Sequence, residues 1–314
     1  MTTLYRDPLF LEHDTGRNHP ERPQRLSAIN DQLDKSGLLP RCRIGETRVA
    51  SRAEIARLHD SNYIDHVREF CADSPGRIEA DTVASRRSYD VALLAAGTAL
   101  AAVDAVMQGE DTTALCLVRP PGHHALPASA MGFCLFNNIA LAAEHALKAY
   151  RLNRVLIVDW DVHHGNGTQD VFYERDDAWF FSAHRFPFYP GTGDANETGT
   201  GKGLGTTFNL PLKFGTSRQE YLQQFETMLH AVADKCRPEL ILLSAGFDAH
   251  VDDPIGSLGL ETEDFAVLTT MICETAETHC RGRLVSVLEG GYNVDALAES
   301  VSAHLETLLA ASPA

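Results

Sequence analysis

Short hydrophobic runs alternate along this chain with longer segments of helical spacing, and this alternation constrains the fold more than any other feature. The runs are rich in β-branched and large apolar residues and end where polar residues begin, as buried strands do. The segments between them carry apolar residues at a period near 3.6, which is typical of helices that cover a sheet. The expected strands are 113–118, 154–158, 178–183, 240–244 and 284–288, and the expected helices are 137–150, 217–236, 261–280 and 294–309.

This order of elements predicts an α/β fold with a parallel sheet and helices on both faces. No Pro/Ser-rich linker, charge block or internal repeat divides the 314 residues, so we expect residues 1–314 to form a single domain. Long connections in compact domains are often functional. Four irregular stretches of this kind are expected at 12–25, 73–87, 120–132 and 185–205.

Charge and hydropathy exclude several kinds of partner. The 43 acidic and 27 basic side chains give a formal charge of −16, which repels phosphate backbones, so direct nucleic-acid binding is not expected. The first residues form no apolar signal segment and no run of 18 apolar residues occurs, so we expect a cytoplasmic protein without membrane association. The seven cysteines include no C-x-x-C pair and are expected to be buried thiols. Oligomeric state has no signal in the sequence.

Polar residues gather directly after the expected strands. The carboxyl ends of parallel strands meet at one edge of a sheet, and ligands of open α/β sheets bind at that edge. We therefore expect these residues to share one site. The clusters are His123-His124, residues 159–164, residues 182–184, residues 244–248 and residues 289–292.

Three of these residues form a candidate metal site. In an extended segment the side chains of Asp161 and His163 would point the same way, and Asp248 ends the apolar run ILLSAGFD. A D-x-H pair alone is more often a hydrogen-bonded loop. Carboxylates at the ends of buried strands are costly, however, unless a cation or hydrogen bonds compensate them. Two carboxylates and one imidazole suit one zinc ion with an open position for water, and ferrous iron accepts the same set.

Hydrolysis of an amide at such a metal also needs a base, an acid and a donor to the oxyanion. His123 and His124 lie on a turn bounded by proline and glycine, and Tyr292 follows two glycines. Taken singly, the histidines fit a loop pair satisfied by backbone, and the tyrosine fits a core residue. All three follow strands of the same expected sheet as the candidate ligands, which favours one hydrolytic site.

Together these motifs resemble the histone deacetylase family, within the arginase/deacetylase fold, from HPER at 19–22 to Tyr292. The matching motifs are RPPGHHA, GFCLFNN, VDWDVHHGNGTQ, SAGFDAH and LEGGYN, in this order. The sequence is most similar to the class II branch and its bacterial relatives, because Asn166 stands where class I members carry aspartate. The resemblance implies an amidohydrolase that uses zinc-activated water to remove acyl groups, above all acetyl, from acyl-lysine side chains or related acylated amines.

The resemblance also implies a role for individual residues. The zinc ligands would be Asp161, His163 and Asp248. The catalytic set would be His124 as principal base and acid, His123 bonded to Asp159 as its electrostatic partner, Asn166 as support for His124, and Tyr292 as donor to the substrate carbonyl. A structural potassium ion would be wrapped by Asp159, Asp161, His163, Ser182 and Ala183, with a second alkali ion near Phe172.

The family's narrow acyl-lysine tunnel would be lined by Gly132, Phe133 and Tyr189, the last of which is usually phenylalanine. Arg22 would lie in the exit channel for acetate. Ile255 stands where polyamine deacetylases carry a glutamate gatekeeper, and isoleucine cannot pair with a second ammonium group. This disfavours polyamine substrates, although Asp252 or Asp253 offers another carboxylate.

Three other functions fit parts of the pattern. One is an acetylpolyamine or other small-amide deacetylase, and another is a non-catalytic protein that binds acyl-lysine. The third is arginase-like chemistry, which shares the fold but needs two metals and a denser set of aspartates. The complete set of ligands, histidines and tyrosine favours the single-metal deacylase.

Overall fold

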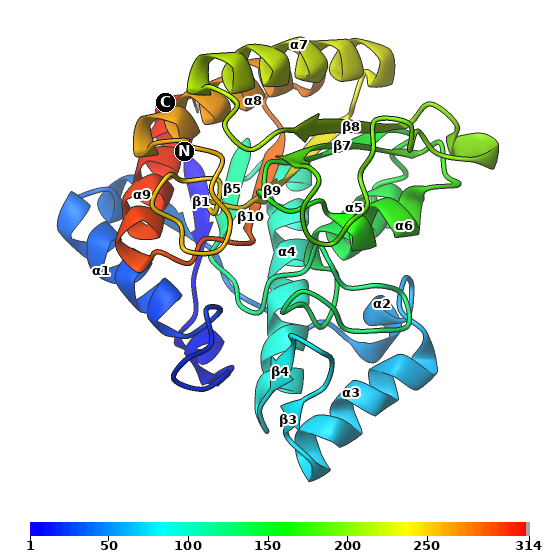
Figure 1. Ribbon diagram of the computed structural model, residues 1–314, viewed down its shortest axis with the longest axis vertical. Coiled ribbons are helices and arrows are strands. Elements are labelled where there is room, and N and C mark those ends of the chain that lie inside the picture. Colours follow the sequence, from blue (N-terminus) through cyan, green and yellow to red (C-terminus); the bar gives the residue numbers. More distant parts are fainter. Residues whose placement is uncertain (312–314) are drawn as a thin grey trace.

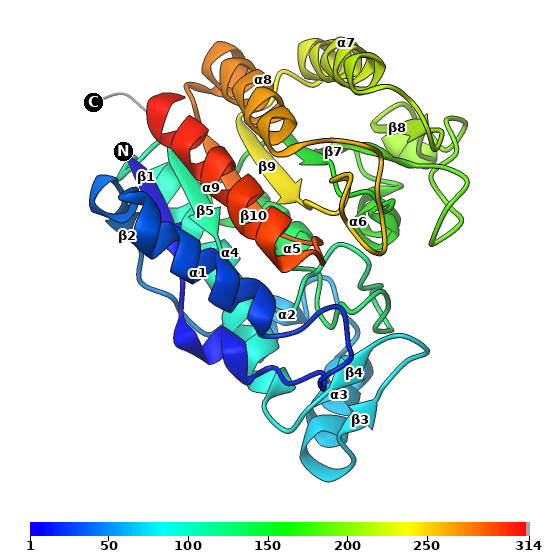
Figure 2. The ribbon, with the colours of Figure 1, turned by 60° about the vertical axis from the view of Figure 1, so that its left-hand side comes forward.

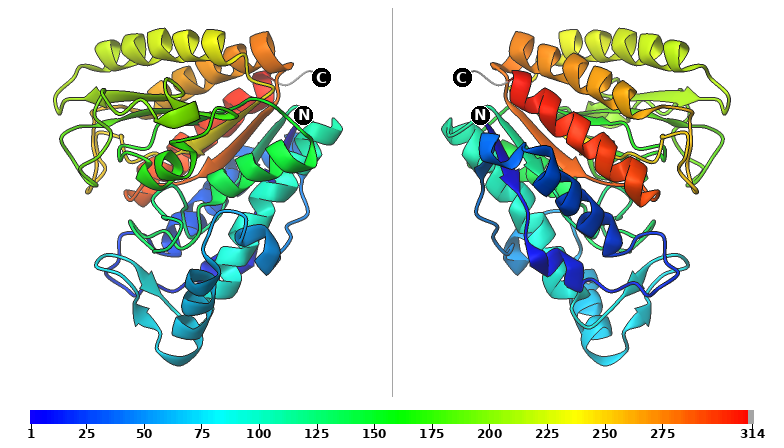
Figure 3. Two further views of the ribbon diagram at one scale, coloured as in Figure 1. Left: turned by 90° about the vertical axis from the view of Figure 1, so that its right-hand side faces the viewer. Right: turned by 90° about the vertical axis from the view of Figure 1, so that its left-hand side faces the viewer.

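The computed structural model describes residues 1–311 and centres on one sheet of eight strands, all parallel, in the order β2-β1-β5-β10-β9-β6-β7-β8 (Figure 1). A separate antiparallel pair, β3 and β4, lies with α3 at the narrow end of the molecule (Figure 3). The strands are β1 (Thr2–Tyr5), β2 (Arg43–Ile44), β3 (Gly76–Arg77), β4 (Val83–Ala84), β5 (Thr113–Cys116), β6 (Val155–Asp159), β7 (Ala178–Arg185), β8 (Thr207–Leu212), β9 (Leu240–Ala245) and β10 (Leu284–Leu288).

Helices cover both faces of this sheet. On one face α1, α9, α8 and α7 lie side by side (Figure 2), and α4, α5 and α6 pack against the other. Three short 3-10 turns are η1 (Pro8–Glu12), η2 (Leu39–Arg41) and η3 (Gly201–Gly203). The helices are α1 (Gln24–Ser36), α2 (Arg52–Ile55), α3 (Ser61–Asp73), α4 (Ser88–Gln108), α5 (Asn138–Ala149), α6 (Asn166–Phe172), α7 (Arg218–Cys236), α8 (Thr262–Cys280) and α9 (Val294–Ala311).

The core lies between the sheet and these two helical layers. Every residue of β6, β9 and β10 is buried, which is why these strands read as continuous apolar runs rather than as alternating ones. Side-chain caps fix where two of the covering helices begin: Asn137 accepts from the Ala140 amide before α5, and Ser217 from the Glu220 amide before α7. All seven cysteines are free, and six of them are buried as expected.

Among the described residues, α4 alone has the length and apolar composition to cross a membrane. Of its most apolar 18-residue window, 72% is buried inside the fold. Its buried alanines and valines pack on α5, β1, β5 and β10. Burial of this kind is what a core helix of an α/β layer requires.

The expected α/β class, the parallel sheet and the nine expected elements are confirmed, with ends shifted by one to a few residues. Two of the stretches expected to be irregular are partly regular. Residues 73–87 contain the β3–β4 hairpin, whose short strands carry no alternating pattern, and β7 runs on to Arg185. The sequence did not predict β1, β2, β8, α1, α2, α3, α4 or α6.

Strand order places the functional loops. After β5 the chain crosses to β6, leaving two positions open, builds β7 and β8 outward, and then returns to fill the gap with β9 and β10. The carboxyl ends of β5, β10, β9 and β6 therefore lie side by side in the middle of the sheet. Ligands bind at such a topological switch point in open α/β sheets.

Candidate active site

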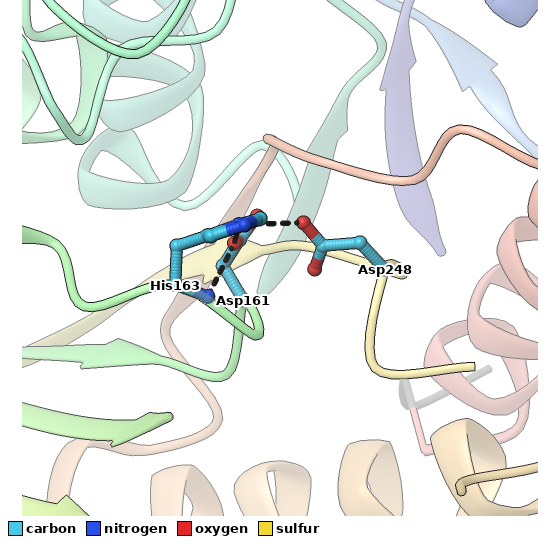
Figure 4. A group of neighbouring side chains, drawn as sticks. All are labelled: Asp161, His163 and Asp248. Atoms are coloured by element: carbon cyan, nitrogen blue, oxygen red, sulfur yellow. Dashed lines mark hydrogen bonds and ion pairs between the residues drawn. The ribbon is translucent and has the colours of Figure 1, made fainter. Parts of the chain in front are cut away.

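Asp161, His163 and Asp248 converge at this point, each offering one ligand atom within 4.8 Å of the others. Asp161 and His163 come from the loop after β6, and Asp248 from the loop after β9 (Figure 4). His163 Nδ1 lies 3.0 Å from Asp161 Oδ1 and 3.0 Å from Asp248 Oδ2. All three side chains are buried, so the structure brings the expected ligands together as a potential metal site.

The backbone that pairs Asp161 with His163 is a bend rather than the extended segment expected from the spacing. The Asp161 carboxylate accepts the His163 amide at 2.9 Å, and the Asp159 carboxylate accepts the Asp161 amide at 3.0 Å. These two side-chain-to-backbone bonds fold the loop over itself. The ligands face one another because of this turn, and the expected extended geometry is wrong.

The donor set fits a bound cation. Asp248 Oδ2 is buried and has no well-formed hydrogen bond among the described residues, although it lies beside His163 Nδ1. One ring nitrogen carries at most one hydrogen and cannot satisfy two carboxylates fully. Burial and then the charge of Asp161 raise the pKa of Asp248 to about 7. A carboxyl group with this pKa stays ionised at neutral pH when a cation lies beside it.

A glycine lets the ligand carboxylates approach the loop after β10. The Gly290 amide donates to Asp161 Oδ2 at 2.8 Å. A β-carbon on Gly290 would lie 2.3 Å from Asp248 Oδ2, which leaves no room for a side chain there. The glycine pair before Tyr292 therefore serves the metal site as well as the turn.

The two histidines lie beside the cluster with the partners that the sequence predicted. His123 Nδ1 lies 2.9 Å from Asp159 Oδ2, and His124 Nδ1 lies 2.7 Å from Asn166 Oδ1. Burial lowers the pKa of His123, but the charges of Asp159 and Asp161 outweigh it and the pKa is raised well above its usual value. Burial and then the charge of His123 hold the pKa of His124 well below its usual value. These opposite shifts favour placing the positive charge of the pair on His123 rather than on His124.

Glu289 fixes the turn that carries these histidines. The sequence did not predict this role for it. It follows β10, and its Oε2 accepts the amides of Gly122 at 2.7 Å and His123 at 3.2 Å. Its other oxygen accepts from the Ser244 hydroxyl at 3.1 Å. The position of Glu289 directly after a buried strand, like that of Asp159, was the signal for it.

A cavity of about 200 Å³ opens onto His124 and His163. The predicted tunnel residues Gly132, Phe133, Tyr189 and Ile255 all line it. Tyr292 lines it as well, together with Asp81 and Phe188, which the sequence did not predict.

Two aromatic residues form part of the cavity wall. Phe133 has a φ of 69° and its amide donates to Thr82 Oγ1 at 3.1 Å, so the β3–β4 turn holds it in this strained conformation. The Tyr189 ring meets that of His124 edge-on, 5.3 Å between centroids. Burial and then the charge of the Asp81 carboxylate, which lines the same cavity, raise the pKa of Tyr189, so this additional hydroxyl, compared with phenylalanine, keeps its hydrogen at neutral pH.

Tyr292 is backed by Arg25, a residue that the sequence did not predict for the site. The Arg25 guanidinium lies 5.2 Å from the centre of the Tyr292 ring and donates to the Gly291 carbonyl at 2.6 Å. Arg22 does not line the cavity. Its Nε is buried without a hydrogen-bond partner among the described residues. Arg25 lies three positions further along the same segment, and the place of Arg22 in an exit channel for acetate stays a prediction.

The residues expected to wrap a potassium ion lie at the adjoining ends of β6 and β7. The sheet register pairs Asp159 with Ser182. Ala183 follows Ser182 in β7, and Asp161 and His163 occupy the bend that leaves β6. Phe172, expected near a second alkali ion, is the last residue of α6.

Comparison with known proteins identifies the family. The family model of the histone deacetylase domain matches residues 19–308. A probable deacetylase of Archaeoglobus fulgidus is 42% identical over 288 residues, which cover 91% of this chain and 80% of the relative. The histone deacetylase-like amidohydrolase of Pseudomonas aeruginosa is 40% identical, covering 90% of this chain and 75% of that protein.

Two further similarities come from a longer relative and a solved structure. The human polyamine deacetylase HDAC10 is 42% identical over 301 residues, which cover 92% of this chain and 44% of HDAC10. The crystal structure of the HDA15 HD domain superposes with a TM-score of 0.92 at 36% identity, covering 98% of this chain and 88% of that one.

Proposed function

Because this chain belongs to the histone deacetylase family and is a hydrolase acting on amides, we propose that it is a zinc-dependent deacylase that removes acetyl groups from acyl-lysine side chains. One observation carries the proposal. A buried Asp/His/Asp cluster, a histidine and a tyrosine come together at one cavity.

Asp161, His163 and Asp248 would hold the metal. Their two carboxylates and one imidazole match the ligand number of catalytic zinc sites, and ferrous iron accepts the same set. When bound, zinc would polarise the amide carbonyl and lower the pKa of water at its open position.

The histidines would move the protons. The His124 Nδ1 atom is engaged with Asn166 Oδ1, which leaves Nε2 of this neutral ring free to take a proton from the attacking water. His123, kept cationic by Asp159, would stabilise negative charge that develops beside it. The same His124 would then return the proton to the leaving nitrogen.

Tyr292 would donate its hydroxyl hydrogen to the oxyanion as the water oxygen bonds to the acyl carbon. Burial and then the charge of Asp248 raise the pKa of Tyr292 well above its usual value. The hydroxyl therefore stays protonated and can donate a hydrogen bond to the oxyanion. Collapse of the oxyanion breaks the carbon–nitrogen bond. Acetate and the protonated lysine amine are the products.

The walls of the cavity support acyl-lysine as substrate. Phe133 and Tyr189 flank the space that an aliphatic lysine stem would occupy, and Ile255 presents no charge to a second ammonium group. A small acylated amine is the second candidate, favoured by the similarity to the polyamine deacetylase HDAC10 and by the Asp81 carboxylate in the cavity wall.

We also propose a structural potassium ion among Asp159, Asp161, His163, Ser182 and Ala183, held largely by backbone carbonyls, and a second alkali ion near Phe172. Adjoining strand ends offer the hard oxygen atoms that such ions prefer. Removal of potassium by dialysis against a sodium-free, potassium-free buffer should lower the melting temperature, and restoring it should reverse the loss.

A turnover panel tests the proposed function. Zinc-loaded protein would be assayed with acetyl-lysine peptides, longer acyl-lysine peptides, acetylpolyamines and small acetamides on one preparation. We expect the highest kcat/KM on acetyl-lysine peptide. Binding of these compounds without release of any acyl group would contradict the deacylase and indicate an acyl-lysine-binding protein.

A further inference from the structure

Asp253 is a buried carboxylate beside the cavity that makes contacts to two separate segments. Its side chain is 8% exposed. Oδ1 accepts the amides of Ile255 and Gly256, each at 2.9 Å. Oδ2 accepts the amide of Tyr292 at 2.7 Å and that of Asn293 at 3.4 Å.

These contacts join the cavity wall to the oxyanion donor. Ile255 and Tyr292 both line the cavity, yet they lie on loops that follow different strands, β9 and β10. The carboxylate fastens the backbone of each residue, one oxygen to each loop. A second bond, from Asn293 Nδ2 to the Asp252 carbonyl at 3.1 Å, strengthens the same junction.

Asp253 has no capacity left for a substrate. Four backbone amides surround its two oxygens, and a buried carboxylate with this many donors is fully engaged. It therefore cannot replace the glutamate gatekeeper as partner of a second ammonium group. Asp252 differs, because its side chain is 69% exposed.

We propose that Asp253 is a positioning residue that sets the backbone of Tyr292, and with it the direction of the hydroxyl, while holding Ile255 in the wall. This inference rests on the proposed function of Tyr292 as oxyanion donor. The donor must meet the oxyanion at hydrogen-bond distance, and a small displacement of its backbone is enough to lose that contact.

Asp253→Asn tests the inference because it keeps the shape of the side chain. The asparagine side chain keeps one acceptor oxygen, but its NH2 group would face backbone N–H groups, which are also donors. One of the two loops therefore loses its hydrogen bonds to this side chain. We expect kcat on acetyl-lysine peptide to fall by about tenfold to a hundredfold and KM to change by less than about threefold.

A double-mutant cycle with Tyr292→Phe separates positioning from general damage. If Asp253 acts through the tyrosine hydroxyl, the double variant should be no slower than Tyr292→Phe alone, within about threefold. Losses that multiply instead would overturn the proposal. Asp252→Asn is the matched control, and it should keep the wild-type kcat on the same peptide.

Hydrogen exchange gives a readout that does not depend on turnover. Peptides containing residues 255–256 and 292–293 should exchange faster in Asp253→Asn than in wild type or Asp252→Asn, with the rest of the chain unchanged. Unchanged exchange at both segments would refute the clamp. If the asparagine variant does not fold, Asp253→Ser, which adds no misdirected amide donor, provides the same comparison. Wild-type protein without activity on any substrate would contradict the proposed function and leave the exchange result to decide the clamp.

Discussion

Gly132 lies so close to His124 that a β-carbon on the glycine would be 2.2 Å from Cδ2 of the imidazole. Gly132 also has a φ of +56°, which disfavours any other residue. Contacts under 3 Å force one group to move, and the ring of His124 is the group in the way. The absence of a side chain at Gly132 therefore leaves the space that the imidazole ring of His124 occupies.

Gly132→Ala should therefore lower turnover by about tenfold or more, because it displaces His124 from its bond with Asn166. The matched control is Gly37→Ala, which has a φ of +72° but no atom within 4 Å of the added carbon. Both variants should lose about 1 kcal/mol of stability from backbone strain, and only the first should lose activity. Equal kcat in the two variants would contradict this role of Gly132.

Tyr292→Phe should reduce kcat by about a hundredfold or more while the metal content stays at the wild-type level, because only the oxyanion donor is removed. Tyr221→Phe is a suitable control, since the Tyr221 hydroxyl is buried without a hydrogen-bond partner among the described residues. Steady-state kinetics and elemental analysis on the same samples check both statements. Near-normal turnover of Tyr292→Phe would remove the tyrosine from the mechanism.

Asp248→Ala should lose the metal, because it deletes one of three ligands and the carboxylate that most needs a cation. Elemental analysis of purified protein should find about one zinc or iron ion per wild-type chain and far less than one in the variant. Asp252→Ala, four residues further along, should retain it. The same measurement distinguishes zinc from iron. Full metal occupancy in Asp248→Ala would place the ion elsewhere.

Ile255→Glu should shift selectivity toward acetylpolyamines, because it places a carboxylate in the cavity wall where a second ammonium group would lie. The ratio of kcat/KM for acetylspermidine to that for an acetyl-lysine peptide should rise by about tenfold, which corresponds to about 1.4 kcal/mol. Ile255→Gln matches the size without the charge and should leave the ratio near its wild-type value. If glutamine raises the ratio as much, the charge argument fails.

Acid should destabilise the fold through His59. Its Nδ1 donates to the Leu126 carbonyl at 3.1 Å and its Nε2 accepts the Asn137 amide at 3.0 Å, so the folded ring has no place for a second hydrogen. Burial lowers the pKa of His59 to about 4. In the unfolded chain His59 takes up a proton near pH 6.5, whereas in the folded chain it stays neutral down to about pH 4. The free energy of unfolding therefore carries no penalty from His59 above pH 6.5 and decreases as the pH falls from 6.5 toward 4.

The loss from His59 should reach about 3 kcal/mol at pH 4. Urea unfolding at a series of pH values from 7.5 to 4.5 measures it. In His59→Gln, whose amide can both donate and accept, the free energy of unfolding should depend less steeply on pH across this interval. An unchanged slope would show that the acid sensitivity arises from other buried groups.

The chemistry of the site was predictable because its residue types are rare at the ends of buried strands. Asp159, His123 and Asp248 each follow a recognisable apolar run, and burial there demands a partner. Glu289 satisfies the same rule, yet its role could not be assigned. It acts on backbone amides 166 and 167 positions away in sequence, and no side-chain pattern records such contacts.

Some of the missed elements lack a periodic face, although α1 and α3 have one and were also not predicted. Helix α4 is buried around most of its circumference, so its sequence has no polar stripe to reveal the helical period. Strands β1 and β2 have only four and two residues, too few for a pattern. The sequence did not indicate Arg25, because its side chain donates hydrogen bonds to backbone carbonyl groups of a loop more than 260 residues away.

The place of β10 in the sheet also makes assembly of the site depend on the last strand of the chain. Without Leu284–Leu288 the sheet would be two separate ribbons. One, β2-β1-β5, leads into His123 and His124, and the other, β9-β6-β7-β8, carries the metal ligands. Within the sheet, β10 is therefore the strand that pairs the half leading to the proton-transfer groups with the half that carries the metal-binding groups. We expect the two parts of the site to reach their final positions only when β10 has paired with both ribbons.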